Sequence, residues 1–179
     1  MIPTITTPRL TLRPLQMVDA EPLYRIYHMD DVLRYFPNPN PPLLERVQKF
    51  IEGQLMRWKQ HGYGHWAIVP RGEKEIIGWA GLQFLPETAE TEVGYLLHRL
   101  YWGRGYGTEA AWSSLQFGFT HFDFEKIIGL VHPENIASQH VLEKCGLAFI
   151  DQKVYFGMDM FRYWIDRQKF QQLLETRRE

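Results

Sequence analysis

The chain has 179 residues, of which 45% are hydrophobic and 23% are charged, and its formal net charge is −1. This length and composition predict a single globular domain over residues 1–179 with a sizeable core. A net charge near zero, without a long basic block, argues against nucleic acid as the main partner.

The sequence also indicates where the protein works. Its one cysteine, Cys145, cannot form an internal disulfide, which fits a reducing compartment. No apolar run is long enough to cross a bilayer, and residues 1–10 hold no signal-peptide core. We therefore expect a soluble cytoplasmic protein without a membrane partner, and the oligomeric state stays open.

The first half of the chain predicts strands and two helices. The segment RLTLRPL alternates and is typical of a strand, and Asp19 is expected to cap a helix through about Asp31. Residues 43–61 carry apolar side chains at helical spacing, namely Leu44, Val47, Ile51, Leu55 and Trp58. HWAIVP and EIIGWAGLQFL are rich in strand-forming residues, with RGEK between them as a turn.

The second half predicts further alternation of strands and helices. TEVGYLLH is a strand, followed by a glycine-rich turn and a helix. KIIGLVHP is continuously apolar, which predicts a strand buried on both faces. The helix NIASQHVLEKCG should end at Gly146, and a hairpin around Gly157 should precede a short terminal helix. The order predicts an α/β fold.

The segment YWGRGYGTEAAW, residues 101–112, is the most informative stretch. Gly103, Gly105 and Gly107 stand immediately before a run of helix formers. A glycine turn between a strand and a helix favours phosphate binding, because backbone N–H groups and the positive helix end point at one place. Arg104 would add positive charge. The alternative is a tight turn that only reverses the chain.

Two nucleotide-binding motifs do not fit this turn. A dinucleotide fingerprint needs a third glycine where Thr108 stands, and an acidic residue at the end of the next strand. Asp123 and Glu125 precede that strand instead. A P-loop needs Gly-Lys-Ser/Thr, which is absent.

The sequence resembles the GCN5-related N-acetyltransferases (GNAT), in the RimJ/RimL-like branch of ribosomal-protein-alanine acetyltransferases. The strongest blocks are EVGYLLHRLYWGRGYGTEAAW and KIIGLVHPENIASQHVLEKCGLAF, and TPRLTLRPL and DAEPLYRIYHMDDVLRYF are weaker ones. The resemblance implies a mixed, mostly antiparallel central sheet with flanking helices. It also implies that the strands EVGYLLH and KIIGLVH splay apart to admit a cofactor.

The cofactor that the resemblance implies is acetyl-CoA, used as a co-substrate and without a metal. The turn backbone would hold its pyrophosphate, through Gly103, Arg104, Gly105, Tyr106, Gly107 and Thr108. Tyr95 and Leu97 match the positions whose backbone pairs with the pantetheine arm. Asn135 matches an asparagine that contacts this arm. As a residue at a helix start it is also a good N-cap, and the two roles do not exclude each other.

Amine acetylation needs a proton acceptor. Amines with a pKa of about 8 to 10.4 are mostly protonated at neutral pH, so a carboxylate near the thioester helps to deprotonate them. Glu92 matches the strand glutamate of the family, and alternation places it on one face with Gly94. The alternative, a solvated charge at a strand end, suits Glu87 and Glu90 better.

The departing thiolate raises the question of a proton donor. Many members of the wider superfamily have a tyrosine where this chain has Leu142. Ser138 matches a serine of the branch and is predicted to donate the proton. The alternative is an ordinary first-turn serine bonded to the helix backbone. Cys145 is interpreted as a core residue and not a nucleophile, because it precedes the glycine that ends a helix and lies eight residues after Ala137. The resemblance implies direct transfer in a ternary complex without a covalent enzyme intermediate.

The acceptor stays open. Members of the branch acetylate protein N-termini, antibiotics, polyamines or other small amines, so we expect a primary amine of a small molecule or a protein N-terminus. Two other functions remain: a non-catalytic acyl-CoA-binding module, and a nucleotide-dependent enzyme that uses the glycine turn.

Overall fold

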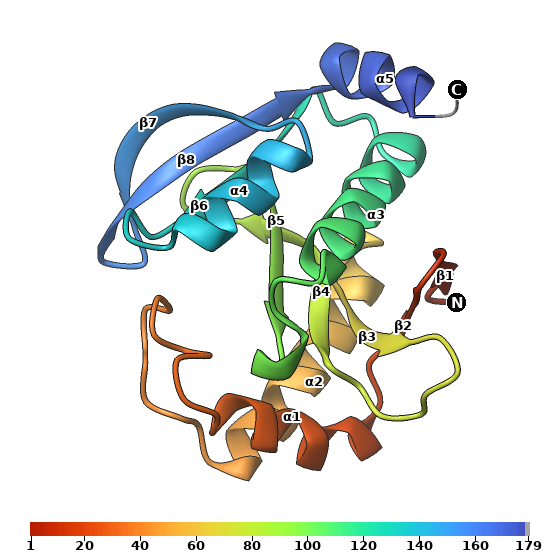
Figure 1. Cartoon of the computed structure of the whole chain (residues 1–179), viewed down its shortest axis with the longest axis vertical. Helices are drawn as coiled ribbons and strands as arrows, with labels where there is room; N and C mark the ends of the chain where they lie inside the picture. The colour runs from red at the N-terminus through yellow and green to blue at the C-terminus, as the bar shows by residue number, and fades with distance from the viewer. Residues whose placement is uncertain (178–179) are drawn as a thin grey trace.

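The computed structural model describes residues 1–177 and has an α/β fold built on an eight-stranded sheet (Figure 1). The strands are β1 (Ile5–Thr6), β2 (Leu10–Pro14), β3 (His65–Pro70), β4 (Gly78–Leu85), β5 (Glu90–Leu97), β6 (Lys126–Val131), β7 (Ala148–Tyr155) and β8 (Met158–Asp166). The helices are α1 (Ala20–Tyr27), α2 (Leu44–His61), α3 (Tyr106–His121), α4 (Ile136–Lys144) and α5 (Arg167–Thr176), with short 3-10 turns η1 (Met17–Asp19) and η2 (Arg99–Tyr101).

The sheet has the order β1-β2-β3-β4-β5-β6-β8-β7. All neighbouring strands are antiparallel except β5 and β6, which run parallel. The predicted mixed, mostly antiparallel sheet with flanking helices is therefore confirmed.

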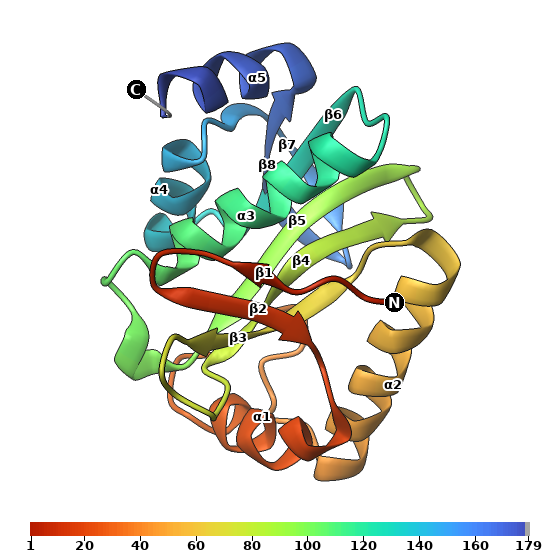
Figure 2. The ribbon, with the colours of Figure 1, turned by 90° about the vertical axis from the view of Figure 1, so that its right-hand side faces the viewer.

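The two faces of the sheet have separate hydrophobic cores. Val93 and Leu97 lie in one core with the apolar residues of α3, whereas Leu96 and Trp79 lie in another with α1 and α2. This division follows from the alternation of side chains along a strand. Figure 1 shows α1 and α2 together in the lower part of the molecule, and Figure 2 shows α3 lying across β4 and β5.

The two central strands separate as predicted. The ladder between β4 and β5 runs from Gly78–Leu97 to Leu85–Glu90, but β5 and β6 are in register at a single pair, Glu92 and Ile128. Beyond Glu92, residues 94–97 have no register partner on β6 in the described part of the chain. The edge of β5 that would face β6 is therefore open to another hydrogen-bonding partner.

The first helix is shorter than predicted. α1 ends at Tyr27, and Asp31 has a left-handed backbone with φ of 65°, which a continuing helix does not allow. Asp19 precedes α1 but its carboxylate does not cap it. It accepts two hydrogen bonds from Arg13, both 2.7 Å long, and one from the backbone of Gln16.

The second helix is confirmed, with one side chain misplaced. Leu55 is exposed, whereas Gln54 is buried among the apolar residues of α2. The reason is a hydrogen bond, because the Gln54 amide oxygen accepts from the backbone N–H of His65 at 3.0 Å. A buried polar side chain is tolerated when it is paired in this way.

The predicted strand EIIGWAGLQFL starts three residues late, because β4 begins at Gly78, whereas the glycines predicted at the end of α4 and in the last hairpin are confirmed. Gly146 follows α4 with φ of 86°, and Phe156 and Gly157, with φ of 53° and 76°, form the two-residue turn between β7 and β8. The β6 strand is buried at Ile127, Ile128 and Val131. Within residues 1–177, no helix has both the length and the apolar character required to cross a membrane.

Candidate active site

The glycine turn opens the start of α3 to a ligand. Gly103 and Gly105 have φ of 71° and 80°, so both need the left-handed freedom of glycine. Gly105 stands at the N-cap position, and no side chain caps the helix. The N–H groups of Tyr106, Gly107 and Thr108 lie in the first turn of α3, where no carbonyl of the helix stands before them to accept a hydrogen bond. They find no partner among the described residues. They are available to bind an anion.

An N-terminal residue holds the turn in place. The Arg9 guanidinium donates to the Arg104 carbonyl at 2.7 Å and pairs with the Glu109 carboxylate at 2.6 Å. Thr7 donates to the same carboxylate at 2.6 Å. Local sequence spacing cannot identify this contact, because Arg9 and Glu109 are 100 residues apart. The Arg104 side chain itself lies over the Tyr101 ring.

The glycine turn lies next to the end of the open edge of β5. The Leu97 carbonyl accepts a hydrogen bond from the Trp102 indole at 2.9 Å, which ties the turn to the end of the strand. A carbonyl has two lone pairs, so this bond leaves room for a second donor. Gly107 packs against the Leu97 side chain, where an added Cβ would lie at 3.5 Å.

Ser138 and Tyr95 form a hydrogen-bonded pair next to this edge. The Tyr95 hydroxyl lies 2.6 Å from the Ser138 hydroxyl and donates to the Ser138 carbonyl at 3.2 Å. Burial raises the pKa of Tyr95 above its ordinary range, so its phenol stays protonated. The Ser138 hydroxyl thus reaches across to β5 instead of its own helix backbone. The sequence predicts only a backbone role for Tyr95 and carries no signal for this side-chain contact.

Asn135 caps α4. Its side-chain oxygen accepts from the Ser138 N–H at 3.1 Å, so the predicted N-cap role is confirmed. The cap leaves the two amide N–H donors of Asn135 without a partner in the described residues. Its predicted contact with a cofactor arm remains a prediction.

Glu92 lies at the last pair between β5 and β6, on the face opposite Tyr95. Its side chain is half-buried, and burial raises its pKa to about 8, although a hydrogen bond from the Leu130 backbone and the charge of Arg57 act in the opposite direction. A solvated carboxylate would keep its ordinary pKa. Glu92 therefore holds and releases a proton close to neutral pH.

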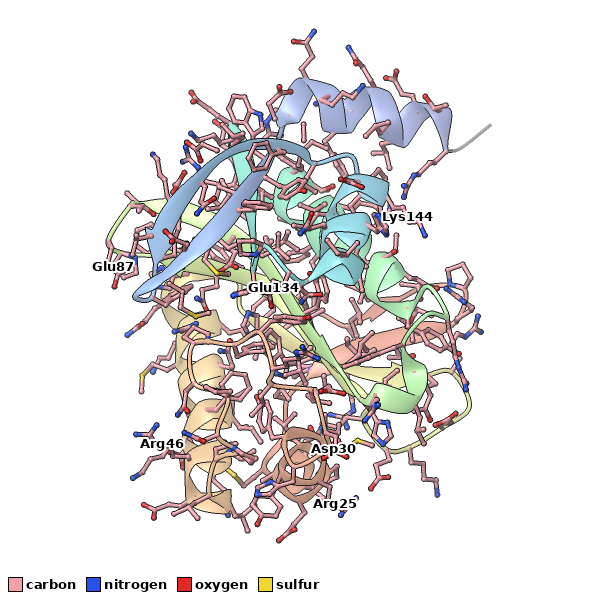
Figure 3. The ribbon with its side chains drawn as sticks, turned by 60° about the vertical axis from the view of Figure 1, so that its left-hand side comes forward. Arg25, Asp30, Arg46, Glu87, Glu134 and Lys144 are labelled. Carbon is pink, nitrogen blue, oxygen red and sulfur yellow. The ribbon has the colours of Figure 1, made fainter. Side chains whose placement is uncertain are left out.

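Glu87 and Glu90 behave differently from each other. Glu87 is exposed in the turn between β4 and β5, as expected (Figure 3). Glu90 was expected to be solvated too, and this prediction is wrong. Its side chain is only 10% exposed, pairs with Arg162 at 2.7 Å and accepts from Tyr155 at 2.7 Å. Arg162 also pairs with Asp151, so these groups lock the β7–β8 hairpin to β5.

Other groups lie apart from this site. Cys145 is fully buried, and burial raises the pKa of its thiol to about 12, which suits a core residue. Among residues 1–177, no cluster of three metal-ligating side chains is found. A cavity of about 800 Å³ is lined by residues of the N-terminal segment and of α3, and by Lys144 and Arg177. It includes Gly105 but none of Glu92, Tyr95 or Ser138.

Comparison with known proteins agrees with this geometry. Residues 9–148 match the model of the acetyltransferase (GNAT) domain. The N-acetyltransferase p20 of Bacillus licheniformis is 30% identical over 149 residues, which cover 78% of this chain and 79% of p20. The N-acetyltransferase YoaA of Bacillus subtilis is 29% identical, over 82% of this chain and 83% of YoaA.

Solved structures share the fold. An acetyltransferase from Agrobacterium tumefaciens has a TM-score of 0.82 and 28% identity, and the match covers 92% of this chain and 95% of that one. The ribosomal L7/L12 alpha-N-protein acetyltransferase RimL, solved in complex with coenzyme A, has a TM-score of 0.78 over 92% of this chain and 98% of RimL. Its identity of 16% supports the fold alone. The chain therefore belongs to the GNAT acetyltransferases and is an N-acetyltransferase.

Proposed function

We propose that the protein transfers an acetyl group from acetyl-CoA to a primary amine, on a small molecule or a protein N-terminus, by direct transfer in a ternary complex. One observation carries this proposal. Where β6 leaves β5, a proton acceptor and a hydroxyl pair stand on opposite faces of the same strand: Glu92 on one face, and Tyr95 with Ser138 on the other.

The residues present fit acetyl-CoA. The unpaired N–H groups at the start of α3 suit a pyrophosphate, because they combine donors with the positive helix end. The open edge of β5 at Tyr95 and Leu97 suits an extended arm that bonds like an added strand. Asn135 offers amide donors to the same arm. Bound there, acetyl-CoA supplies an activated thioester.

Glu92 acts as the base. It takes a proton from the acceptor ammonium, directly or through water, and the neutral amine then attacks the thioester carbonyl. A carboxyl group with a pKa of about 8 is well matched to an α-amine, whose pKa is also about 8. The acceptor approaches from the face of α1 and α2, since Glu92 points there.

Ser138 and Tyr95 act on the leaving group, the thiolate of coenzyme A. As the carbon–sulfur bond breaks, the Ser138 hydroxyl, 2.6 Å from the protonated Tyr95 hydroxyl, donates a hydrogen bond to the departing sulfur and shares its proton with the thiolate, and solvent returns a proton to Ser138. A thiol has a pKa of about 8.5, so partial proton transfer is enough and the gain is modest. The assignment to the RimJ/RimL-like branch is part of this proposal and is supported by Ser138 and by the shared blocks.

Two measurements test the proposal. Acetyl-CoA should raise the thermal midpoint, whereas ATP and NADH should not, since only a ligand that binds the folded state stabilises it. Coenzyme A release should then be followed over a panel of amines that includes peptides with free N-termini. Stabilisation by ATP or NADH instead would favour a nucleotide-dependent enzyme. Binding of acetyl-CoA without turnover of any amine would favour a non-catalytic module.

A further inference from the structure

His65 is a buried histidine without a hydrogen-bond partner for its ring. It begins β3 and is 3% exposed, and neither Nδ1 nor Nε2 finds a partner in the described part of the chain. Leaving a buried polar group unpaired costs about 1–3 kcal/mol. Such groups are rare in folded proteins and call for an explanation, such as a bound water or a role in catalysis.

The ring of His65 stacks on Trp79, and its Nε2 faces β5. It stacks on Trp79 with a centroid distance of 4.3 Å and an interplanar angle of 13°. Its cross-strand neighbour is Gly81, whose own neighbour on β5 is Gly94. A Cβ at Gly81 would lie 2.1 Å from the Gly64 carbonyl, so no side chain fits between the ring and β5.

The ring nitrogen comes close to the strand that carries Glu92. A Cβ added to Gly94 would lie 3.8 Å from His65 Nε2, so this nitrogen stands above Gly94. Gly94 and Glu92 are two residues apart on one strand and therefore share a face. The unpaired nitrogen and the half-buried carboxyl group therefore lie over the same face of β5.

The charge of Arg57 acts on both His65 and Glu92. The positive charge of the Arg57 guanidinium, on α2, lowers the pKa of both residues. The guanidinium donates to Gln83 at 2.6 Å, and Gln83 is the cross-strand neighbour of Glu92. From α1, the Tyr27 hydroxyl faces this region and accepts from the indole under the imidazole. Burial is the main reason that the pKa of His65 falls to about 3, so its ring stays neutral.

We propose that His65 is a positioning residue for the acetyl transfer: its Nε2–H holds a water molecule above Gly94 that donates a hydrogen bond to the Glu92 carboxylate. The proposal rests on the proposed role of Glu92 as the base. The acceptor amine passes its proton to this water, and the water passes one of its protons to Glu92. His65 gains and loses no proton, and its N–H only fixes the water.

The first test uses the wild-type protein. With ¹⁵N-labelled histidine, the Nε2 resonance of His65 should move as Glu92 titrates near pH 8, and Glu92→Gln should remove that step. This measurement needs no turnover and no ligand, so it stands even if the amine panel shows that the proposed function is wrong. An Nε2 resonance that ignores the titration of Glu92 would overturn the proposal.

The second test compares His65→Leu with His65→Gln. Loss of the donor should raise the pKa of Glu92, move the rising limb of kcat/KM to higher pH and lower kcat/KM at pH 7 about tenfold, with the KM for acetyl-CoA unchanged. His65→Gln, which keeps an N–H donor at a similar distance from the backbone, should restore most of the activity. Equal pH profiles for wild type and a folded His65→Leu would reduce His65 to a structural role.

A matched control is available on α3. His121 also stacks on an aromatic ring, Phe117, at 4.4 Å and 25°, but its Nδ1 lies 3.0 Å from the Phe117 carbonyl. His121→Leu removes a stacked imidazole far from Glu92 along the chain and on another element. It should leave the pH profile of kcat/KM unchanged, and a shift equal to that of His65→Leu would contradict the proposal.

Discussion

Replacing Glu92 by glutamine should make the protein more stable and far less active. Burial raises the pKa of Glu92 from 4.5 to about 8 in the folded protein. The folded state therefore binds the proton more tightly than the unfolded chain, and an ionised Glu92 costs stability as the pH rises from 4.5 to 8. One pKa unit corresponds to about 1.4 kcal/mol, so the full cost approaches about 5 kcal/mol, and contact of the carboxyl group with solvent lowers it.

Thermal unfolding of both proteins between pH 5 and pH 9 measures this effect. Glu92→Gln has no charge to bury, so the two midpoints should nearly coincide at pH 5 and diverge by several degrees at pH 9, at about 2–4 °C per kcal/mol for a chain of this size. Glu87→Gln, in an exposed turn, is the matched control and should show no such divergence. A constant gap, or a Glu92→Gln protein that is less stable at pH 9, would refute the reasoning.

The same variant tests the base in kinetics. Turnover should fall by about 10²-fold or more, because general base catalysis contributes about that much, while affinity for acetyl-CoA stays nearly unchanged. Wild-type kcat/KM should rise with pH toward about 8, where Glu92 ionises. A Glu92→Gln protein with wild-type rates across this range would show that the amine loses its proton elsewhere.

Three further variants address other parts of the molecule. Gly105→Val should abolish the thermal stabilisation by acetyl-CoA, whereas Gly157→Val, with a left-handed φ of 76° in the turn between β7 and β8, should keep it. Ser138→Ala and Tyr95→Phe should each lower turnover about tenfold with acetyl-CoA affinity within a few-fold, and the double variant should lose no more than the worse single one, because the two hydroxyls act as a pair. Arg162→Met should cost about 3 kcal/mol in unfolding free energy at pH 7 by leaving the Glu90 carboxylate without its ion pair, and less as falling pH protonates that carboxylate.

The features predicted correctly from the sequence are those that depend on residues close together in the chain. Alternation, strand-forming composition or a continuous apolar run predicted every strand from β2 to β8, but not β1. A glycine or a cap residue marked the ends of elements, as at Gly146 and Asn135. These signals depend on neighbours within a few residues, so they survive without knowledge of the fold. The same is true of the glycine turn, where positive φ values are a property of two residues and their immediate chain.

Contacts between residues far apart in the chain could not be predicted from the sequence, because only the fold brings them together. Glu90 lies next to Arg162, 72 residues away, so its strand-end position gave no hint of its burial. Arg9 and Glu109 are likewise joined only by the fold. The unpaired ring of His65 is a property of three strands in register, and no local pattern encodes it.

The alternation of β5 gives the proposed reaction its direction. Because neighbouring residues of a strand point to opposite faces, Glu92 meets the acceptor side and Tyr95 meets the side of α4. A shift of one residue in register would exchange these faces and separate Tyr95 from Ser138. The long ladder with β4 prevents such a shift, while the short ladder with β6 opens a gap at the same place. β5 is therefore held by β4 along one edge, while its other edge is free to bond to a ligand. In the proposed reaction, acetyl-CoA and the acceptor meet at this part of the strand.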